Sequence, residues 1–534
     1  MASQRRRLAQ KGVSLIVGTA SMVLLIPSAG LSVDAALLYY TKTRLQGAVD
    51  GAALGAARAL SLGSTPALQT SLAKQDAVNW FYANFPTTLW GTSNTQMDQS
   101  MVTVADDPNN PRLRNVSVSA NTTVPTIFMR WFNMNSTLVA ATGTASRRDV
   151  VAMMVIDRSG SMNNNNGCSN MRSAAKLFTG QFAAGRDQIG MVEFGDTAWV
   201  DSSPTTNFQT VLGYNAGSSS GNGLIDTINC NDNTGTAQAI SLGYNELYKT
   251  ALPGAFNFMM FFTDGIPNTV TVNLKTVMLS SSSCKDSNGT AISSGGNMSS
   301  HPRAWTPGWA FTGYYTPSIP AGPIGAVAAD DPSGSGSYGV RNYMGTSQSS
   351  NGHGTISSGN APGCSFPSNE SNFVNDFQKL PPTDAWGNAL VNASYNPLTV
   401  DGSGNVVLSS AAQTQSCCTA LTGNNLTFHL AARNAADNAA FQARSNATLA
   451  ATIFGIGLGG TSAAPPGYDF MQRITNDPNG DLYNSPALYP ACSSEPLCVT
   501  HSDQPQGVFI FSSDPTKLQQ AFLDMASQIL RLAK

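Results

Sequence analysis

The chain of 534 residues is too long for one ordinary domain, and its hydrophobic share of 41% is enough to build more than one core. Only 11% of the residues are charged and the net charge is −2, which excludes the basic surface that nucleic-acid binding needs. The expected surface is polar but weakly charged.

The eight cysteines indicate an oxidising compartment. None precedes residue 150, and no two have the spacing of a zinc site. Disulfides are therefore favoured over free thiols. The cysteines are Cys168, Cys230, Cys284, Cys364, Cys417, Cys418, Cys492 and Cys498.

The N-terminus predicts a membrane anchor. A basic cluster ending at Lys11 precedes an uncharged run from Gly12 to Val33, which Asp34 ends. This run is long enough to cross a bilayer, and the basic cluster should remain in the cytoplasm. The alternative is a cleaved signal peptide, but the run exceeds a usual signal core and no A-x-A site closes it. We expect a single-pass protein of the bacterial inner membrane, with its bulk periplasmic or on the cell surface.

The residues after the span carry a family pattern. The segments G-L-S-V-D (Gly30–Asp34) and L-Q-x-A-x-D-x-A-A-L (Leu45–Leu54) resemble the TadE/TadG-like family of Tad/Flp pilus assembly. The resemblance implies pilus components as partners. Pilin-type processing at Gly12 would need a glutamate where Val17 stands, so a TadG-like anchor is favoured over a processed pseudopilin. An unrelated signal-anchor helix with an Ala-rich stalk is the alternative.

Residues 61–148, which follow an N-terminal segment of residues 1–60, predict a small α+β stalk without chemistry. A helix over Ala73–Tyr82 should place Trp80, Phe81 and Phe85 in a core, and alternating runs predict strands at Asn115–Val124 and Ser136–Ala145.

From residue 149 to 534 the pattern predicts a doubly wound, mostly parallel α/β sheet of Rossmann-like type. Continuous apolar runs indicate buried parallel strands, and amphipathic segments between them indicate helices. The expected strands are Asp149–Ile156, Gln188–Phe194, Phe256–Phe262, Ala451–Leu458 and Val508–Phe511, and the clearest helices are Met171–Ala183, Ala431–Arg444 and Pro515–Leu532.

This alternation of apolar strands and amphipathic helices stops between about residues 266 and 426, where Gly, Ser, Asn and Pro dominate. A structureless loop of that length inside a compact domain is improbable. We expect an inserted, disulfide-stapled module. Its aromatic cluster Trp305–Tyr315 fits either a small core or a recognition surface.

Oxygen-bearing side chains follow two of the predicted strands. Asp157, Ser159 and Ser161 form D-x-S-x-S after the first strand, and Asp264 follows a later one. Ligands of open α/β sheets bind at the carboxyl ends of strands, and oxygen ligands suit Mg²⁺, Mn²⁺ or Ca²⁺.

These motifs, with Thr234 between them, resemble the metal-ion-dependent adhesion site (MIDAS) of the von Willebrand factor type A (VWA) family. The resemblance implies that Asp157, Ser159, Ser161 and Thr234 bind a divalent cation, Mg²⁺ first, and that Asp264 acts through water. The family often has Gly-Gly before the threonine, where Asp232 and Asn233 stand here. Thr236 is therefore a second candidate and Asp232 a further outer carboxylate. The alternative is a degenerate site whose serines only cap a helix.

Two disulfides are expected. Cys168 and Cys230 belong to loops that should meet around the ion, and Cys492 with Cys498 should form a local bridge.

The sequence favours a binding protein over an enzyme. The loop Gly217–Gly223 lacks the lysine of a phosphate-binding loop, and no Ser/His/Asp or Cys/His order suggests a nucleophile. We expect adhesion to a protein or cell-surface ligand whose acidic group completes the metal sphere. A structural role in pilus assembly and, third, a metal-dependent hydrolase are the alternatives.

Overall fold

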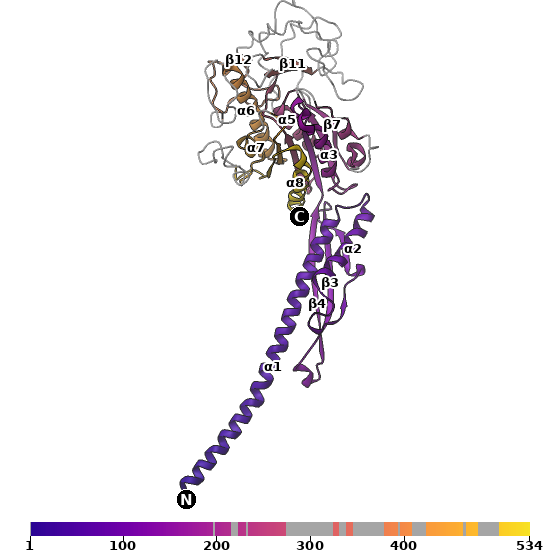
Figure 1. Cartoon of the computed structure of the whole chain (residues 1–534), viewed down its shortest axis with the longest axis vertical. Helices are drawn as coiled ribbons and strands as arrows, with labels where there is room; N and C mark the ends of the chain where they lie inside the picture. The colour runs from indigo at the N-terminus through magenta and orange to yellow at the C-terminus, as the bar shows by residue number, and fades with distance from the viewer. Residues whose placement is uncertain are drawn as a thin grey trace, which may run out of the picture. The chain divides into compact units, whose positions relative to one another are not determined.

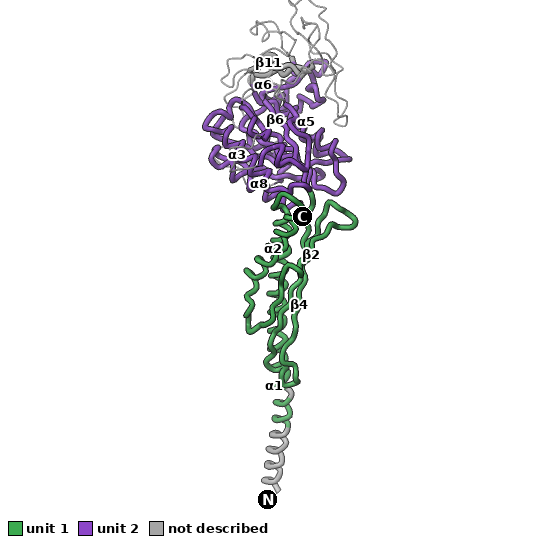
Figure 2. Tube along the Cα trace, turned by 90° about the vertical axis from the view of Figure 1, so that its right-hand side faces the viewer, with its two compact units in different colours: residues 1–149, 534 green, residues 150–533 purple. Residues whose placement is uncertain are grey.

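The computed structural model describes residues 2–195, 198–214, 223–230, 233–273, 324–329, 338–344, 379–392, 396–407, 423–462, 466–478 and 501–533. The chain divides into two compact units, residues 1–149 (unit 1) and 150–533 (unit 2) (Figure 2). Cys284, Cys364, Cys417, Cys418, Cys492, Cys498, Asp232 and Trp305–Tyr315 lie outside the described residues.

Unit 1 packs two helices on an antiparallel sheet. The long helix α1 (Ala2–Ala59) and α2 (Pro66–Asn84) cover a sheet in which β3 pairs with β1, β2 and β4. Small residues of α1 let it lie close to the sheet, and Ala48, Ala52 and Ala56 are buried there. The strands are β1 (Ser93–Gln96), β2 (Val102–Asp106), β3 (Leu113–Pro125) and β4 (Ser136–Arg148), with short helices η1 (Leu89–Gly91), η2 (Gln99–Met101) and η3 (Met129–Phe132).

The first part of α1 is long and apolar enough to cross a membrane. An 18-residue window has a mean hydropathy of 1.7 and is largely unburied within the chain. Pro27 lies inside the helix. By length and composition, α1 has the properties of a single-pass anchor.

The stalk core differs from the prediction at one residue. Phe81 and Phe85 are fully buried, but Trp80 is 51% exposed, so its assignment to the core was wrong. The Trp80 ring lies over Gly55 of α1, where an added Cβ would come within 2.4 Å of it. One face of the indole therefore packs on the helix while the other stays in contact with solvent.

Unit 2 contains a six-stranded sheet in the order β15-β14-β8-β5-β6-β7. All neighbours are parallel except β7, which pairs antiparallel with β6 at the edge. The predicted doubly wound fold is confirmed. The strands are β5 (Val150–Asp157), β6 (Gln188–Phe194), β7 (Ala198–Thr205), β8 (Phe256–Thr263), β14 (Thr452–Leu458) and β15 (Phe509–Ser512).

Helices cover both faces of this sheet (Figure 1). On one face, α3 (Gly167–Thr179) and α8 (Leu518–Leu532) share a core with alternate residues of β5 such as Met154. The opposite face is covered by α5 (Thr236–Thr250), α6 (Gly423–Ser445) and α7 (Tyr468–Thr475). Successive side chains of β5 point to opposite faces of the sheet, and both faces are covered by helices. Every position of β5 is therefore buried, which explains why the strand is apolar throughout.

The region of the expected insertion belongs in part to the core of unit 2. Leu380, Trp386 and Leu390 are buried in the same cluster as α5 and α6. The segment between β8 and α6 (the excursion) begins with β9 (Thr269–Asn273), which forms an antiparallel sheet with β10 (Ile324–Ala329) and β11 (Tyr338–Met344). Two shorter strands, β12 (Lys379–Leu380) and β13 (Val406–Val407), also pair with each other. A deletion of the whole of residues 266–426 would therefore remove core residues, among them Val270 of β9, Leu380 and Trp386.

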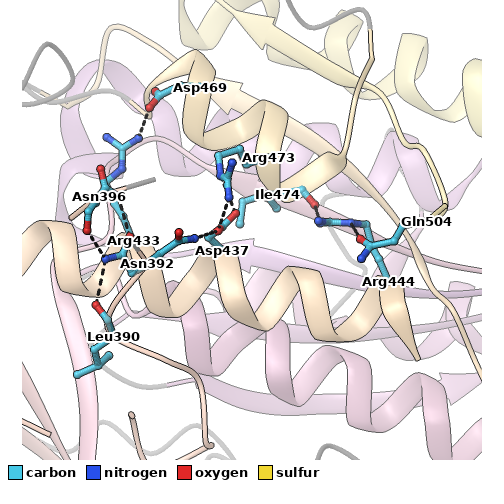
Figure 3. Close-up of polar contacts among 11 residues, drawn as sticks. Leu390, Asn392, Asn396, Arg433, Asp437, Arg444, Asp469, Arg473, Ile474 and Gln504 are labelled. Atoms are coloured by element: carbon cyan, nitrogen blue, oxygen red, sulfur yellow. Dashed lines mark hydrogen bonds and ion pairs between the residues drawn. The ribbon is translucent and has the colours of Figure 1, made fainter. Parts of the chain in front are cut away.

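A buried polar network holds this returning segment against α6 (Figure 3). Asp437 accepts two hydrogen bonds from Arg473 of α7, at 2.9 and 2.7 Å, and a third of 2.8 Å from Asn392. Asn434 donates to the carbonyl groups of Leu390 and Asn396, both at 3.0 Å. The helix α6 thus joins α7 to Leu390, Asn392 and Asn396 through polar contacts as well as through the apolar core.

Candidate metal centre

The D-x-S-x-S segment forms a turn at the carboxyl end of β5. Asp157 is the last residue of the strand, and its Oδ1 accepts a 2.7 Å hydrogen bond from the backbone N–H of Ser159. The hydroxyls of Ser159 and Ser161 lie 3.2 Å apart. The turn therefore points one carboxylate and two hydroxyls toward one place.

The loop after β8 brings the second carboxylate. β5 and β8 are parallel neighbours with Ile156 opposite Phe262, so their ends meet at one edge of the sheet. The Asp264 carboxylate accepts hydrogen bonds from Ser159 at 3.2 Å and Ser161 at 2.9 Å. Four of the five expected metal ligands thus form one buried cluster.

The Thr263 hydroxyl and the Asp264 N–H, both in the loop after β8, approach the same oxygen of Asp157. The Thr263 hydroxyl donates to Asp157 Oδ2 at 2.5 Å, and the Asp264 N–H lies 3.4 Å from that oxygen. Thr263 was not singled out from the sequence. Its place directly before Asp264 in T-D-G is the signal that could have found it.

The loop that carries Thr234 and leads into α5 (the threonine loop) lies beside the loop that carries Asp264. The N–H of Thr234 donates to Asn268 Oδ1 at 2.6 Å, and the Asn268 N–H donates to the Thr234 carbonyl at 3.1 Å. Thr236 is the first residue of α5, and its buried hydroxyl has no hydrogen-bond partner among the described residues. The backbone contacts of Thr234 thus tie its loop to the loop after β8, and the hydroxyl of Thr236 makes no hydrogen bond to a described residue.

A disulfide and an asparagine side chain join the first loop to the threonine loop. Cys168, in the first turn of α3, is bonded to Cys230, with the two Cα atoms 6.0 Å apart. Asn163 donates a 2.7 Å hydrogen bond to the Cys230 carbonyl. The expected link between these loops is thus present in the structure.

Other asparagines support the same loop from the β14 side. Asn164 and Asn165 donate to the carbonyl groups of Thr461 and Gly460 at 2.8 and 2.6 Å. Asn165 has a φ of 50°, in the left-handed region that asparagine adopts more readily than most residues. The run of four asparagines at 163–166 is the sequence signal for this support.

The electrostatics of the cluster favour a bound cation. Burial, and then the charge of Asp264, raises the pKa of Asp157; burial also raises the pKa of Asp264, although the Thr461, Ser161 and Ser159 hydroxyls act to lower it. Among the described residues neither carboxylate forms an ion pair, and Asp264 Oδ2 is buried without a hydrogen-bond partner. Two adjacent buried carboxylates are costly unless a positive charge accompanies them.

The described contacts of the neighbouring Arg158 are with groups other than these two carboxylates. Arg158 Nη1 donates to the Asn229 carbonyl at 3.1 Å, and its guanidinium lies 4.6 Å from the centre of the Trp199 ring. Its Nε lies 3.9 Å from Glu193. No group of three or more His, Cys, Asp or Glu residues suited to a metal occurs in the described ranges, so an ion here would depend on the hydroxyls as well. This donor set fits Mg²⁺ or Ca²⁺.

Two family models match the chain. The von Willebrand factor type A domain model matches residues 152–266, and the Flp pilus-assembly TadE/G-like model matches residues 12–59. No curated protein matches.

Several solved structures of pilus proteins are similar to this chain. The PilB minor pilin from Streptococcus sanguinis is 10% identical with a TM-score of 0.31, over 83% of this chain and 80% of that one. The vWF domain of the type V pili tip protein Mfa5 from Porphyromonas gingivalis is 15% identical with a TM-score of 0.31, over 73% and 98%. The pilus adhesin SpaC from Lactobacillus rhamnosus GG is 12% identical with a TM-score of 0.32, over 81% of this chain and 36% of that one.

Unit 2 has the α/β fold of a von Willebrand factor type A domain, and the model of that domain matches its residues 152–266. The chain combines this domain with an N-terminal segment that matches the TadE/G-like model at residues 12–59.

Proposed function

We propose that the chain is a membrane-anchored, extracytoplasmic component of a Tad/Flp-type pilus system that binds a protein or surface ligand through a divalent cation. The observation that carries the proposal is the buried cluster of Asp157, Ser159, Ser161 and Asp264, which places two carboxylates together without a basic partner among the described residues.

The cation would be held by Asp157, Ser159 and Ser161, with Thr234 or Thr236 from the threonine loop and Asp264 through water. Mg²⁺ suits this set best, and Mn²⁺ or Ca²⁺ are alternatives. Because these residues all lie at one edge of the sheet, one coordination position would remain open on that side. An acidic side chain of the partner would complete the sphere, so that binding depends on both metal and ligand charge.

The site is proposed as a binding site rather than a catalytic one. Both carboxylates would be occupied by the ion or its waters, which leaves neither as a general base. The Nδ1–H of His429 donates to the Pro267 carbonyl, 2.9 Å away, and burial lowers the pKa of His429 to about 4. This histidine is therefore neutral and bonded to the loop after β8.

Ser161→Ala tests adhesion against assembly. Removing one hydroxyl should weaken the ion without disturbing the core, so cells should keep normal pili and lose adhesion to their target surface. Electron microscopy would count the pili and an adherence assay would measure binding. Ser173→Ala is the matched control, because this half-buried serine of α3 bonds to the Ser169 carbonyl of its own helix. Absence of pili in the Ser161 variant alone would favour the structural role in assembly.

Loss of the Cys168–Cys230 bridge should affect the metal more than the fold. The double variant Cys168→Ser/Cys230→Ser frees two loops while leaving the sheet intact, and supporting interactions of this kind change metal affinity about 10- to 100-fold. Calorimetric titration of the full chain with Mg²⁺ would measure the loss. A shift in thermal unfolding with unchanged metal affinity would contradict the prediction.

The anchor predicts one topology. Reporter fusions placed after Asp34 should be active in the periplasm because the basic N-terminal cluster remains in the cytoplasm. A periplasm-dependent reporter that is silent in these fusions, with a cytoplasmic reporter active, would exclude this orientation.

A further inference from the structure

The tip of the β3–β4 hairpin is fastened to α1 by one buried side chain. The Asp34 carboxylate accepts hydrogen bonds from three consecutive backbone N–H groups, those of Ile127, Phe128 and Met129, at 2.8, 2.9 and 2.6 Å. Asp34 is fully buried by this contact. Three N–H donors on one carboxylate fix the height of the tip along the helix.

That height coincides with the end of the apolar run. Phe128 packs on Gly30, where an added Cβ would lie 2.4 Å from its ring, and Gly30 is inside the uncharged segment that ends at Val33. The run from Gly12 to Val33 spans about 33 Å as a helix, close to the roughly 30 Å hydrocarbon core of a bilayer. Figure 1 shows α1 continuing past the hairpin tip.

The tip exposes large apolar side chains at this level. Trp131 is 81% and Phe132 63% exposed, and Ile127 and Met134 are also exposed. Arg130, between them in sequence, is exposed as well. A surface loop of a soluble protein rarely presents so many large apolar groups together. Tryptophan beside arginine is instead the composition of a membrane interface.

An apolar cavity continues this surface along α1. It has a volume of about 540 Å³ and lies between Val33, Leu37 and Tyr40 of α1, Trp90, and Pro125 and Ile127 of the hairpin. Trp90 has a φ of 54°, an uncommon conformation for a bulky residue, and its ring meets Tyr40 edge-on at 5.9 Å. The cavity and the tip share Ile127. One apolar surface therefore extends from the hairpin tip, at the end of the span, to Tyr40 and Trp90.

We propose that the β3–β4 tip is a second membrane-contacting element, which inserts Trp131, Phe132 and their neighbours into the interfacial layer of the bilayer that α1 crosses. The proposal rests on the proposed membrane anchor. Lipid is the occupant because the tip is continuous with the spanning helix and held at the depth where that helix leaves the hydrocarbon. Two points of attachment fix the angle of unit 1 to the membrane, which a single helix does not.

Spin-label accessibility on the full chain in phosphatidylcholine/phosphatidylglycerol nanodiscs tests this depth. A ketone-bearing amino acid carries the label at position 131, at position 25 within the span, or at position 68. Leu68 is an exposed apolar residue of α2, which follows the far end of α1. We expect the labels at 25 and 131 to be more accessible to oxygen than to a nickel chelate, and the label at 68 to show the reverse.

Nickel accessibility at 131 equal to that at 68 would overturn the proposal. Low accessibility to both reagents at 131 would also overturn it, in favour of a protein that covers the tip. If position 25 is itself accessible to nickel, the anchor fails and the inference fails with it; a lipid-exposed position 25 with an aqueous position 131 rejects the inference alone.

Native tryptophan fluorescence gives a second measurement without a label. Brominated lipids should quench the wild-type chain, and Trp131→Phe should remove a clear part of that quenching. Trp80→Phe is the control, because Trp80 is 51% exposed but packs on Gly55 toward the other end of α1. Equal loss in both variants would contradict the proposal.

The role of Asp34 is tested with the label at 131. Asp34→Asn replaces the charged acceptor of the three N–H groups and should release the tip, so that nickel accessibility at 131 rises. Asp76→Asn on α2 is the control for charge removal. An unchanged label in the Asp34 variant would show that the hairpin alone, and not its bond to α1, sets the depth.

Discussion

Asp157→Asn should raise the dissociation constant for Mg²⁺ by at least about 100-fold. This is the upper end of the affinity lost when a residue that supports a metal ligand is mutated. The variant replaces the carboxylate that the turn at Ser159 and the Thr263 hydroxyl hold in place. Calorimetric titration of the full chain with Mg²⁺, Mn²⁺ and Ca²⁺ would measure the loss. Asp524→Asn, an exposed carboxylate of α8, is the control and should bind metal normally.

The same variant should have opposite effects on stability with and without metal. At saturating Mg²⁺ the wild-type chain gains about 2.7 kcal/mol for every hundredfold excess over the dissociation constant, and the variant loses this gain. Without metal, the variant removes one of two buried like charges and should unfold at a higher temperature than the wild type. A variant that is less stable than wild type in both conditions would show that Asp157 serves the fold only.

The pH dependence of the metal-free chain follows from the direction of the pKa shifts. A carboxyl whose pKa is raised on folding binds its proton more tightly in the native state than in the unfolded one. The contribution of these two carboxyls to stability is therefore largest below their ordinary pKa near 4 and is lost as the pH rises through the raised value. Mg²⁺ competes with these protons, so its stabilising effect should be larger at pH 8 than at pH 5. Thermal unfolding at both pH values, with and without Mg²⁺, measures this difference.

Much of the sheet could be predicted because its strands are buried on both faces. Runs such as Val150–Ile156 are apolar without interruption, and the ligand residues follow them directly in sequence. β7 was missed because an edge strand needs no such run: Ala198–Thr205 contains Asp201, Ser202 and Pro204. The edge position, which only the fold determines, makes those residues acceptable.

The core role of residues 379–407 could not be predicted from local pattern. Asp384 is fully buried and accepts hydrogen bonds from the N–H groups of Trp386 and Asn388, at 2.9 and 2.8 Å. Burial raises the pKa of Asp384 to about 7. A sequence with Asp, Asn and Gly is typical of an exposed turn. Contacts with distant helices, such as that of Asn388 with Ser241 of α5 at 3.2 Å, show that this turn is interior.

The site was more predictable in its ligands than in its supports. Asp157, Ser159, Ser161 and Asp264 carry a recognisable motif, whereas Asn163, Asn164 and Asn268 act through contacts with loops 34 to 297 residues away. Polar residues that bond across such separations leave no periodic signal. The choice between Thr234 and Thr236 stays open for the same reason, and Thr234→Val against Thr236→Val, titrated with Mg²⁺, would decide it.

Asp437→Ala should destabilise unit 2 by about 3–5 kcal/mol, the usual cost of breaking a buried ion pair from one side. The Arg473 and Asp437 side chains are 9% and 7% exposed, so the arginine left behind cannot regain water without opening the packing of α7 on α6. Hydrogen exchange of peptides from α6 and α7, in the full chain, would measure the lower free energy of opening for unit 2 alone.

The hydrogen bond from Asn392 to Asp437 extends this destabilisation to residues 380–392. Asn392 loses its acceptor in the Asp437 variant, so peptides covering residues 380–392 should exchange faster together with α7. The double variant Asp437→Leu/Arg473→Met removes both charges and should recover most of the loss, because apolar groups of similar volume often replace a buried ion pair without cost. Recovery of α7 but not of residues 380–392 would assign the hold on the returning segment to the Asn392 hydrogen bond. A single variant that exchanges like the wild type would show that the pair contributes nothing, and that apolar contacts such as those of Trp386 and Leu390 alone keep this segment in the core.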